Sequence, residues 1–349
     1  MSAELCGILK LLHRRERSQA ALARELNMSR AWAHKQVHAL TDLGFISATG
    51  DTHDPSGPGR PGQELKISAG LPYVSALIIH TTWRFSLELY RYGSREPLIA
   101  RELSSCDNVP EFVQEIAAGL SALEQECALK AQVLLLATQA TLEQGADGIM
   151  YRNNHLKDEC VPLARLLKEA TSLPSYVYNY AIGPMLSLYH APGVDIDSAL
   201  VLMCGEGSVA LGVFIDGRLI TGQHDSFPEC SHLPYPRGFE KCLGSFTAKS
   251  ADALSFAIRA LAPIFNLRRV IVAGSTFKEH LEALGSVMRS FRDDPNPLLR
   301  NLSIEYREKE MAGLMDEFIN LSFDRLVEVL DPSPQKKSLP DFLAARENS

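Results

Sequence analysis

A pattern of helix starts and stops in the first 45 residues most restricts what this chain can fold into. Apolar residues at spacing i, i+3, i+4 and i+7 predict a short amphipathic helix, formed by Leu5, Ile8, Leu9 and Leu12. Ser18 and Ser29 stand where a hydroxyl can cap a following helix, with a tight turn at Asn27-Met28 between them. Gly44 follows the third helix and can take the left-handed conformation that ends helices. The sequence therefore predicts helix, helix, short turn and helix.

Two short strands are predicted after Gly44. Phe45-Ile46 can start the first strand, and residues 64–67 alternate polar and apolar side chains like a half-buried second strand. Residues 51–62 between them are polar and rich in glycine and proline. Two short strands around such a loop form a wing beside the helices.

The third predicted helix has an apolar face and a polar, cationic face. Ala33, Val37 and Leu40 share the side that a core would cover. The opposite side and its flanks carry Arg30, Ala31, Trp32, His34, Lys35 and His38. A face of this kind suits insertion into the major groove of DNA; the alternative is a solvated face of a small helical subdomain. The wing and the capped preceding helix favour an α+β winged helix-turn-helix over residues 1–69.

Six residues are candidates for contact with double-stranded DNA. Arg30 and Lys35 can donate hydrogen bonds to guanine or phosphate, and Ser29 at the helix N-terminus can hold a phosphate. Arg60 lies in the Gly/Pro-rich loop and can enter a narrow minor groove, although such a tract can also be a flexible linker. The predicted set is Ser29, Arg30, Trp32, His34, Lys35 and Arg60.

The charge distribution agrees with a nucleic-acid role for this segment alone. The chain has a net charge of −7, but residues 1–66 hold nine Lys or Arg against seven Asp or Glu. That leaves +2 for this segment and −9 for the rest of the chain.

Composition places the chain among ordinary globular proteins. It is 46% hydrophobic and 22% charged, and its longest apolar runs fall far short of the roughly 20 residues of a membrane helix. The seven cysteines show no C-x-x-C spacing, which predicts reduced thiols. Three arginines, Arg14, Arg15 and Arg17, interrupt the position of a signal peptide. We therefore expect a cytoplasmic protein without membrane insertion.

Beyond residue 70, alternating strands and helices predict an α/β fold. A first set has strands at 73–80, 84–91 and 97–103, a helix at 110–127 and a strand at 132–138. A second set has strands at 198–204, 208–215 and 218–221, a helix at 249–264, a strand at 270–273 and a helix from about 278. Asp216-Gly217 predicts a two-residue hairpin turn. A last helix is expected over 308–330, with an apolar stripe of Met311, Leu314, Met315, Phe318 and Leu321.

A series of short motifs follows one another along the chain. They are Gly59-Arg60-Pro61, Gly148-Ile149, Asn179-Tyr180-Ala181, Val209 to Gly212, Asp216-Gly217-Arg218-Leu219 and Glu229-Cys230-Ser231-His232. In their order and spacing these motifs resemble the ROK family (repressor, ORF, kinase), specifically its Mlc- and NagC-type transcriptional repressors. The resemblance implies an actin-like, sugar-kinase-like, two-lobed effector domain over residues 70–349. Its lobes would be about 70–190 with the C-terminal helix, and 191–307.

The resemblance also implies that the chain is not an enzyme. The family's kinases begin the fold with a D-x-G-G-T phosphate loop, where this sequence has Ile79-His80-Thr81-Thr82-Trp83. Their Asn-Asp pair supplies the general base, where this sequence has Asn179-Tyr180. A phenol with an ordinary pKa near 10 is a poor base at neutral pH. In the second glycine-rich loop, Glu206 would place a negative charge beside ATP.

The family's zinc site is only partly matched. His232 and Cys242-Leu243 fit the pattern, but the C-x-C-G part is missing and Gly244 replaces the final glutamate. Two ligands cannot complete a tetrahedral structural site, so we expect no zinc and no other cofactor. A rearranged site that uses Cys230 is the alternative.

The resemblance assigns sugar hydroxyl recognition to Asn179, Glu229 and His232. A carboxylate, an amide and an imidazole can each bond a hydroxyl in a fixed direction; alternatively, Glu229 and His232 pair with each other. The sequence thus predicts a DNA-binding repressor of carbohydrate-related genes. It would act as a homodimer or homotetramer on a double-stranded operator, with a sugar or sugar phosphate as effector. The alternatives are a regulator controlled by a protein partner, with a vestigial pocket, and an active sugar kinase.

Overall fold

A computed structural model describes most of the chain and divides it into two compact units. The first unit is Met1–Tyr180 with Asp316–Ser349, and the second is Ala181–Met315. The described residues are 3–52, 63–153, 156–191, 196–205, 208–222, 226–230, 233–235, 248–274, 277, 280–307 and 313–330. The predicted contact residue Arg60 and the predicted ligand His232 lie outside these ranges, as does Cys242.

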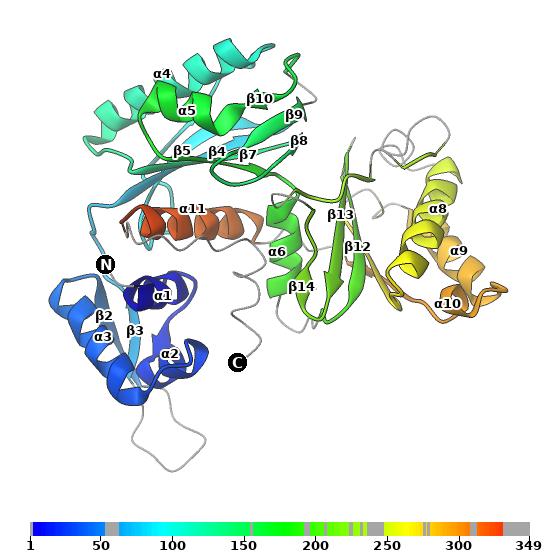
Figure 1. Ribbon diagram of the computed structural model, residues 1–349, viewed down its shortest axis with the longest axis horizontal. Coiled ribbons are helices and arrows are strands. Elements are labelled where there is room, and N and C mark those ends of the chain that lie inside the picture. Colours follow the sequence, from blue (N-terminus) through cyan, green and yellow to red (C-terminus); the bar gives the residue numbers. More distant parts are fainter. Residues whose placement is uncertain are drawn as a thin grey trace. The chain divides into compact units, whose positions relative to one another are not determined.

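Three helices and a small antiparallel sheet form the N-terminal segment, residues 3–67 (Figure 1). The elements are α1 (Ala3–Leu12), β1 (Arg17–Ser18), α2 (Gln19–Glu25), α3 (Arg30–Asp42), β2 (Ile46–Thr52) and β3 (Gln63–Ile67). The sheet has the order β1-β3-β2. Both predicted caps are confirmed, because Ser18 Oγ accepts from the Ala21 amide and Ser29 Oγ from the Trp32 amide, each at 3.2 Å. Gly44 ends the third helix with a φ of +75°, also as predicted.

A five-stranded mixed sheet is the centre of the first unit. Its strands are β4 (Val74–His80), β5 (Phe85–Arg91), β6 (Ile99–Glu102), β7 (Val133–Thr138) and β11 (Ser175–Asn179), in the order β11-β7-β4-β5-β6. Strands β4 and β11 run parallel to β7, whereas β5 and β6 are antiparallel to their neighbours. The carboxyl ends of β4, β7 and β11 therefore lie along one edge of the sheet.

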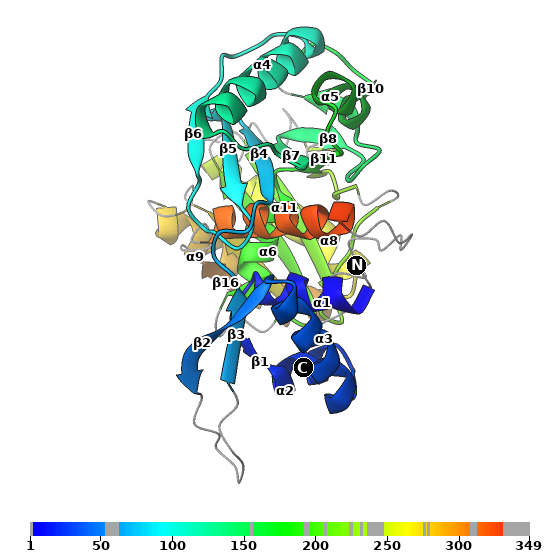
Figure 2. The same ribbon diagram turned by 90° about the vertical axis from the view of Figure 1, so that its left-hand side faces the viewer.

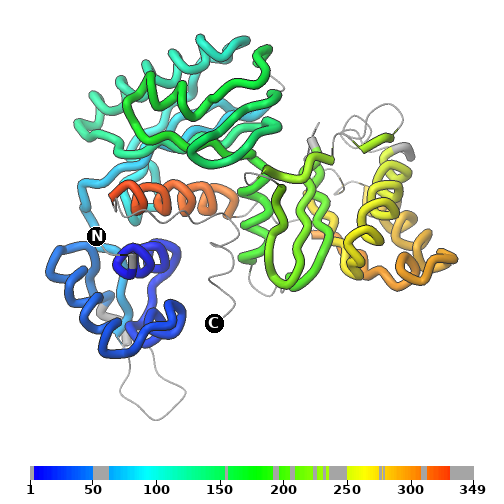
Figure 3. Tube along the Cα trace, in the orientation of Figure 1, coloured from blue at the N-terminus to red at the C-terminus, as the bar shows by residue number. Residues whose placement is uncertain are grey.

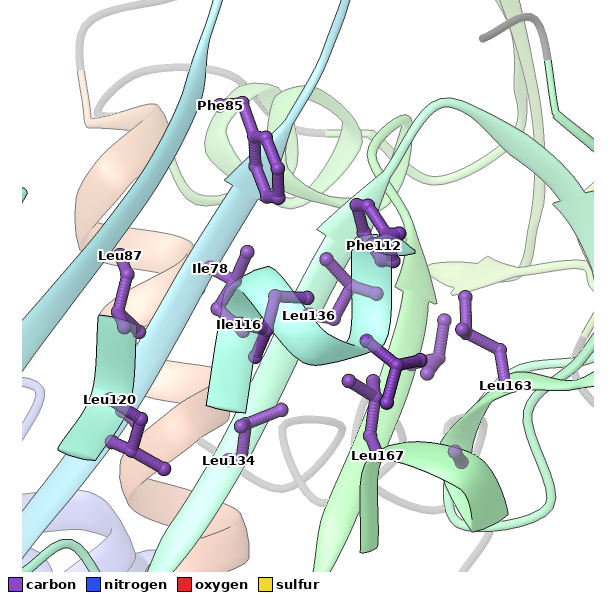
Figure 4. Close-up of a cluster of buried hydrophobic side chains, with 14 of the residues drawn as sticks. Ile78, Phe85, Leu87, Phe112, Ile116, Leu120, Leu134, Leu136, Leu163 and Leu167 are labelled. Carbon is purple, nitrogen blue, oxygen red and sulfur yellow. The ribbon is translucent and has the colours of Figure 1, made fainter. Parts of the chain in front are cut away.

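Helices cover both faces of this sheet. Helices α4 (Val109–Cys127) and α5 (Leu163–Thr171) lie on one face, and α11 (Leu314–Leu330) runs along the other (Figures 1 and 2). Figure 4 shows the apolar core under α4 and α5, where Phe85, Phe112, Ile116 and Leu136 meet. A smaller sheet with the order β10-β9-β8 flanks it, formed by β8 (Ala140–Leu142), β9 (Ile149–Asn153) and β10 (Val161–Pro162).

The second unit, which is green to orange in the tube of Figure 3, has a sheet with the same strand order as the first. Its sheet, β14-β13-β12-β15-β16, contains β12 (Ala199–Gly205), β13 (Ser208–Ile215), β14 (Arg218–Leu219), β15 (Arg269–Ala273) and β16 (Ser303–Arg307). Strand β12 pairs antiparallel with β13 and parallel with β15, as β4 does with β5 and β7. Its helices are α6 (Ile182–His190), α8 (Ala248–Ile264), α9 (Leu281–Arg292) and α10 (Pro297–Arg300). The predicted hairpin turn is confirmed, with φ of +50° at Asp216 and +72° at Gly217.

The last helix differs from its expected start at residue 308. Helix α11 begins at Leu314, after Gly313 with a φ of +92°, and the strand β16 precedes residue 308. The apolar periodicity continues across Gly313, from Met311 to Leu314, so periodicity alone does not show where the helix begins. Within the expected stripe, Leu314, Phe318 and Leu321 are buried, and Met311 lies outside the described residues. Among the described helices, none is long and apolar enough to span a membrane.

Candidate functional site

The polar face of α3 is exposed over its whole length. Ser29, Arg30 and Trp32 are exposed in its first turn, followed by His34 and Lys35. The opposite face is buried through Ala33, Val37 and Leu40, as the periodicity predicts. The first turn of α3 carries no acidic residue, so no carboxylate of that turn offsets the positive end of the helix dipole. This end of α3 is suited to bind an anion such as a phosphate.

Aromatic and cationic side chains meet on that face. The Lys35 ammonium lies 5.2 Å from the centroid of the Trp32 ring, which is a cation–π contact. The His34 and His38 rings pack edge to face with centroids 4.6 Å apart. His34 Nδ1 lies 3.3 Å from Gln19 Oε1 at the start of α2. The helix thus presents ordered side chains that combine positive charge with flat rings.

A buried ionic contact joins the N-terminal segment to α11, which lies between that segment and the five-stranded sheet (Figure 1). His13 Nε2 is 3.1 Å from Asp324 Oδ1, and Arg14 Nη2 is 2.8 Å from Asp324 Oδ2. Burial raises the pKa of Asp324, while Arg14 and Lys10 oppose that shift. One carboxylate on α11 therefore holds two residues that follow α1.

The loop after β5 adds further bonds at the same place. Arg95 donates from Nη2 to the His13 carbonyl oxygen at 2.6 Å and from Nη1 to Asn320 Oδ1 at 2.7 Å. The Tyr92 hydroxyl donates to the Leu9 carbonyl oxygen at 3.1 Å. Helix α1, the first lobe and α11 are therefore linked through hydrogen bonds that are buried or partly buried.

The surroundings of His13 favour its neutral imidazole. Its side chain is fully buried, and its Nδ1 has no hydrogen-bond partner among the described residues. Nε2 then carries the proton and donates to Asp324, while Nδ1 keeps its lone pair. Burial lowers the pKa of His13 well below its ordinary value, and the nearby charges of Arg14, Arg95 and Lys10 lower it further.

A second ionic contact connects α1 to strand β11 through α11. Lys10 Nζ lies 2.7 Å from Glu328 Oε1, and Arg325 Nη1 lies 2.6 Å from Glu328 Oε2. Arg325 also donates from Nε to the Tyr178 hydroxyl at 2.7 Å, and its guanidinium lies 4.8 Å from the centroid of the Tyr176 ring. Burial opposes ionisation of Glu328, but Arg325 and Lys10 together hold its pKa below the ordinary value.

The sequence did not point to this interface. Its signal in the sequence is weak: Asp324, Arg325 and Glu328 are three more charged residues on a helix that also carries Asp316 and Glu317. That pattern is typical of any solvated helix face. Only the packing of α1 against α11 distinguishes a buried ionic contact from a surface one.

Asn179 and Tyr180 stand at the carboxyl end of β11. Asn179 Nδ2 donates to the Ala140 carbonyl oxygen at 2.9 Å, and its backbone amide donates to Gln144 Oε1 at 3.1 Å. Tyr180 is buried and packs against Phe318 of α11, with ring centroids 5.3 Å apart. Burial raises the pKa of Tyr180 above its ordinary value, so its hydroxyl stays protonated at neutral pH.

Large side chains occupy the turn after β4, the predicted counterpart of the kinases' first phosphate loop. His80 is buried between Phe85 and Phe112, and its Nδ1 lies 3.0 Å from Thr138 Oγ1. The Thr82 amide donates to Gln139 Oε1 at 3.0 Å, which ties the turn to the end of β7. Trp83 is 56% exposed and lies edge to face with Tyr180 at 6.2 Å between ring centroids. The turn offers no glycine for close backbone approach to a phosphate.

The remaining predicted ligand residues are only partly placed. Glu229 is half-buried in the second unit, whereas Asn179 belongs to the first, so their convergence stays a prediction. His232 is not among the described residues. Within the described ranges, no group of three or more His, Cys, Asp or Glu side chains is arranged to hold a metal ion.

Comparison of folds relates the chain to known structures. A ROK-family transcriptional regulator, a homologue of the E. coli Mlc protein, is 16% identical with a TM-score of 0.64, covering 93% of this chain and 98% of that chain. A candidate N-acetylmannosamine kinase from Listeria monocytogenes (14% identity, TM-score 0.52) covers 71% of this chain and 98% of its own. For a ROK hexokinase from Thermus thermophilus (16% identity, TM-score 0.50), these shares are 74% and 99%.

The chain shares the fold of ROK-family proteins. The structural resemblance that the motifs predicted is thereby confirmed. By contrast, no family model matches the sequence, and no curated protein sequence matches it. The similarity is thus one of fold, with few identical residues.

The state of His13 gives a prediction for stability against pH. Its lowered pKa means that the unfolded chain binds more protons at this position than the folded protein below about pH 6.5. We expect the free energy of unfolding to fall between pH 7 and pH 5, by up to about 2 kcal/mol from this group. In His13→Gln, whose amide keeps a donor near Asp324, this part of the pH dependence is expected to disappear.

Thermal melts of both proteins from pH 7 to pH 5 measure this difference. Asp324 is present in both proteins, so its own titration largely cancels. His34→Gln, at an exposed position, is the matched control and should keep the slope of the native protein. Equal slopes for the native protein and His13→Gln would contradict the neutral state of His13.

Proposed function

We propose that the protein is a sequence-specific DNA-binding transcriptional regulator with a non-catalytic, sugar-kinase-like sensor domain. The observation that carries this proposal is the exposed cationic face of α3, in a segment held to the first lobe through α11. Residues 1–69 would be a winged helix-turn-helix domain, with α2 and α3 as its helix pair and β2 and β3 as its wing. Residues 70–349 would be the effector and oligomerisation domain.

The shares of the chain that the neighbours cover support this assignment. The regulator covers 93% of the chain and the two kinases cover 71% and 74%. The difference is close to the length of residues 1–69, which is the part that a sugar kinase does not need. A regulator therefore accounts for more of this chain than a kinase does.

Binding to DNA would begin at the first turn of α3. Ser29 and the helix N-terminus would hold a phosphate, and Arg30 and Lys35 would reach base edges or phosphates in the major groove. Arg60, between β2 and β3, would enter the neighbouring minor groove. Because one helix makes few base contacts, we propose a homodimer or homotetramer on two related half-sites.

Substitutions on α3 test this proposal. We expect Arg30→Ala to weaken operator binding by about 1 to 3 kcal/mol and to relax the preference for one base pair. Lys35→Ala should weaken binding to all DNA sequences. It should also reduce the slope of log affinity against log salt concentration by about one. Arg60→Ala should also weaken binding.

Gel shifts on a fragment that the full-length protein selects from genomic DNA measure these effects. None of the three variants should lower the melting temperature. Lys157→Ala removes a comparable charge from an exposed position in the first lobe and should bind like the native protein. Native affinity in all three test variants would sink the DNA-binding assignment.

The sensor domain would not transfer phosphate. Tyr180 stands where the kinases have their general base, and its raised pKa keeps it protonated. Thr81 and Thr82 stand where the phosphate loop would need glycines, and Ile79 where it would need an aspartate. The second proposed property of this domain is therefore ligand binding without turnover.

An assay of sugar-dependent ATP hydrolysis tests the missing activity. The native protein should show no turnover above background with common hexoses and N-acetylated sugars. Tyr180→Asp should not restore turnover, because the phosphate loop is still absent. Detection of sugar phosphate made by the native protein would establish the kinase alternative.

Helix α11 offers a physical route from the proposed ligand site to DNA. Asn179 is proposed as a ligand residue, and it ends the strand that carries Tyr176 and Tyr178. These tyrosines contact Arg325, which shares Glu328 with Lys10 of α1. A ligand that moves the end of β11 would therefore change the contacts of α11 with α1, and with them the position of α3.

Ligand control is tested by binding and by DNA affinity together. A sugar or sugar phosphate that binds the folded state should raise the melting temperature, and Glu229→Ala should abolish that rise. Trp32→Phe leaves Trp83 as the only tryptophan, so its fluorescence reports binding near Tyr180. The same ligand must also change the affinity of the protein for the operator. A ligand that binds both conformations of the protein equally well does not shift the equilibrium between them.

Glu328→Gln separates binding from transmission. It should keep the thermal shift by the ligand but reduce the ligand's effect on operator affinity. If no hexose, N-acetylated sugar or sugar phosphate has both effects on the native protein, control by a protein partner becomes the better proposal. Loss of the thermal shift in Glu328→Gln would instead place Glu328 in the binding site.

A further inference from the structure

Both tryptophans of the chain are exposed, and one of them lies on the face proposed to meet DNA. Trp32 is 42% exposed in the first turn of α3. Its neighbours on that face are polar or small, and the core side of the helix is already filled by Ala33 and Leu40. Indole is a large apolar side chain that is mostly buried in proteins. The exposure of this indole is explained if a binding partner covers it.

The local structure fixes where the indole stands. The backbone amide of Trp32 is bonded by Ser29 Oγ, which sets the first turn of the helix. Lys35, one turn further on, lies with its ammonium over the ring. The N-terminal residues of a recognition helix are those that reach base edges in the major groove. Trp32 is the one large apolar side chain among Arg30, His34 and Lys35 at this end of α3.

The chemistry of indole restricts what it can recognise in that groove. It has one N–H donor, no hydrogen-bond acceptor and a broad apolar surface. The major-groove edges of adenine, guanine and cytosine offer polar atoms, whereas thymine adds a C5 methyl group. An apolar ring in the groove therefore gains most from contact with thymine.

We propose that Trp32 makes operator recognition depend on thymine, through contact of its indole with the C5 methyl group. The same ring holds the Lys35 ammonium by cation–π contact, so that Lys35 donates to a neighbouring base or phosphate from a fixed position. The inference rests on the proposed DNA-binding function. It adds the base that is read and the residue that reads it.

Replacement of single thymines by uracil in the selected operator tests the methyl contact. Uracil keeps the pairing and the groove hydrogen bonds of thymine and lacks only the methyl group. For the native protein we expect one or two positions in each half-site to lose about fourfold in affinity, as burial of one methyl-sized group predicts. In Trp32→Ala those positions should become insensitive to uracil.

Two matched variants make this test specific. Trp83→Ala removes the other exposed tryptophan, which lies in the first lobe, and should keep the native uracil profile. Trp32→Phe retains an apolar ring and should keep part of the sensitivity. The melting temperature of each variant is also measured. It should equal that of the native protein, because the substituted residues are exposed.

A double-mutant cycle tests the link to Lys35. Because the ring holds the ammonium, Trp32→Ala and Lys35→Ala together should cost less affinity than the product of the two single losses. Independent losses would overturn the proposed support of Lys35 by Trp32.

The possible failures are distinguishable. A native protein that selects no DNA fragment refutes the proposed function, and this inference with it. A protein that binds its operator but tolerates uracil at every thymine refutes the inference alone. A uracil effect that persists in Trp32→Ala assigns the methyl contact to another residue and also overturns it.

Discussion

Asp324 is the residue on which the arrangement of the first unit depends. Its buried carboxylate accepts from Arg14 and pairs with His13, although these residues are more than 300 positions away in the sequence. Removing one partner of such a buried contact leaves an uncompensated polar or charged group, so its geometry is strongly held. Helix α11 thereby holds the first helix in place, together with Tyr92 and Arg95 of the lobe. The interface also lowers the pKa of His13, because burial disfavours its charged form and the charges of Arg14 and Arg95 add to that effect.

Helix α11 has two functions in the structure that use different sides of it. Phe318 and Ser322 face the sheet, where they meet Tyr180 and Ser75. Asp324 and Glu328 face α1. A helix packed between the end of β11 and the N-terminal segment is a short physical link between them, because it contacts both.

Aromatic side chains gather at the edge of the sheet where β4 and β11 end. His80 ends β4, Trp83 lies in the turn after it, and Tyr180 follows β11. His80 packs against Phe85 and Phe112, and Tyr180 packs against Phe318, so this edge is lined with rings. The apolar layers on the faces of the sheet form the core that stabilises it, whatever stands at this edge.

Local signals determined the elements, and tertiary contact decided how they work together. The caps at Ser18 and Ser29, the turn at Asp216-Gly217 and the exposed face of α3 were predictable, because each depends on residues within one or two turns of chain. The late start of α11 and the strands β8 to β11 were not, because their sequence patterns are short or are broken by a glycine. The ionic contact of α1 with α11 was also hidden, since charged residues on a helix are read as solvated until a distant segment is known to cover them. The sequence by itself therefore determined the α/β class and the candidate DNA face. Only the tertiary structure decided that Lys10, His13 and Arg14 meet α11, because burial of a charge is a property of the packed chain and not of its local sequence.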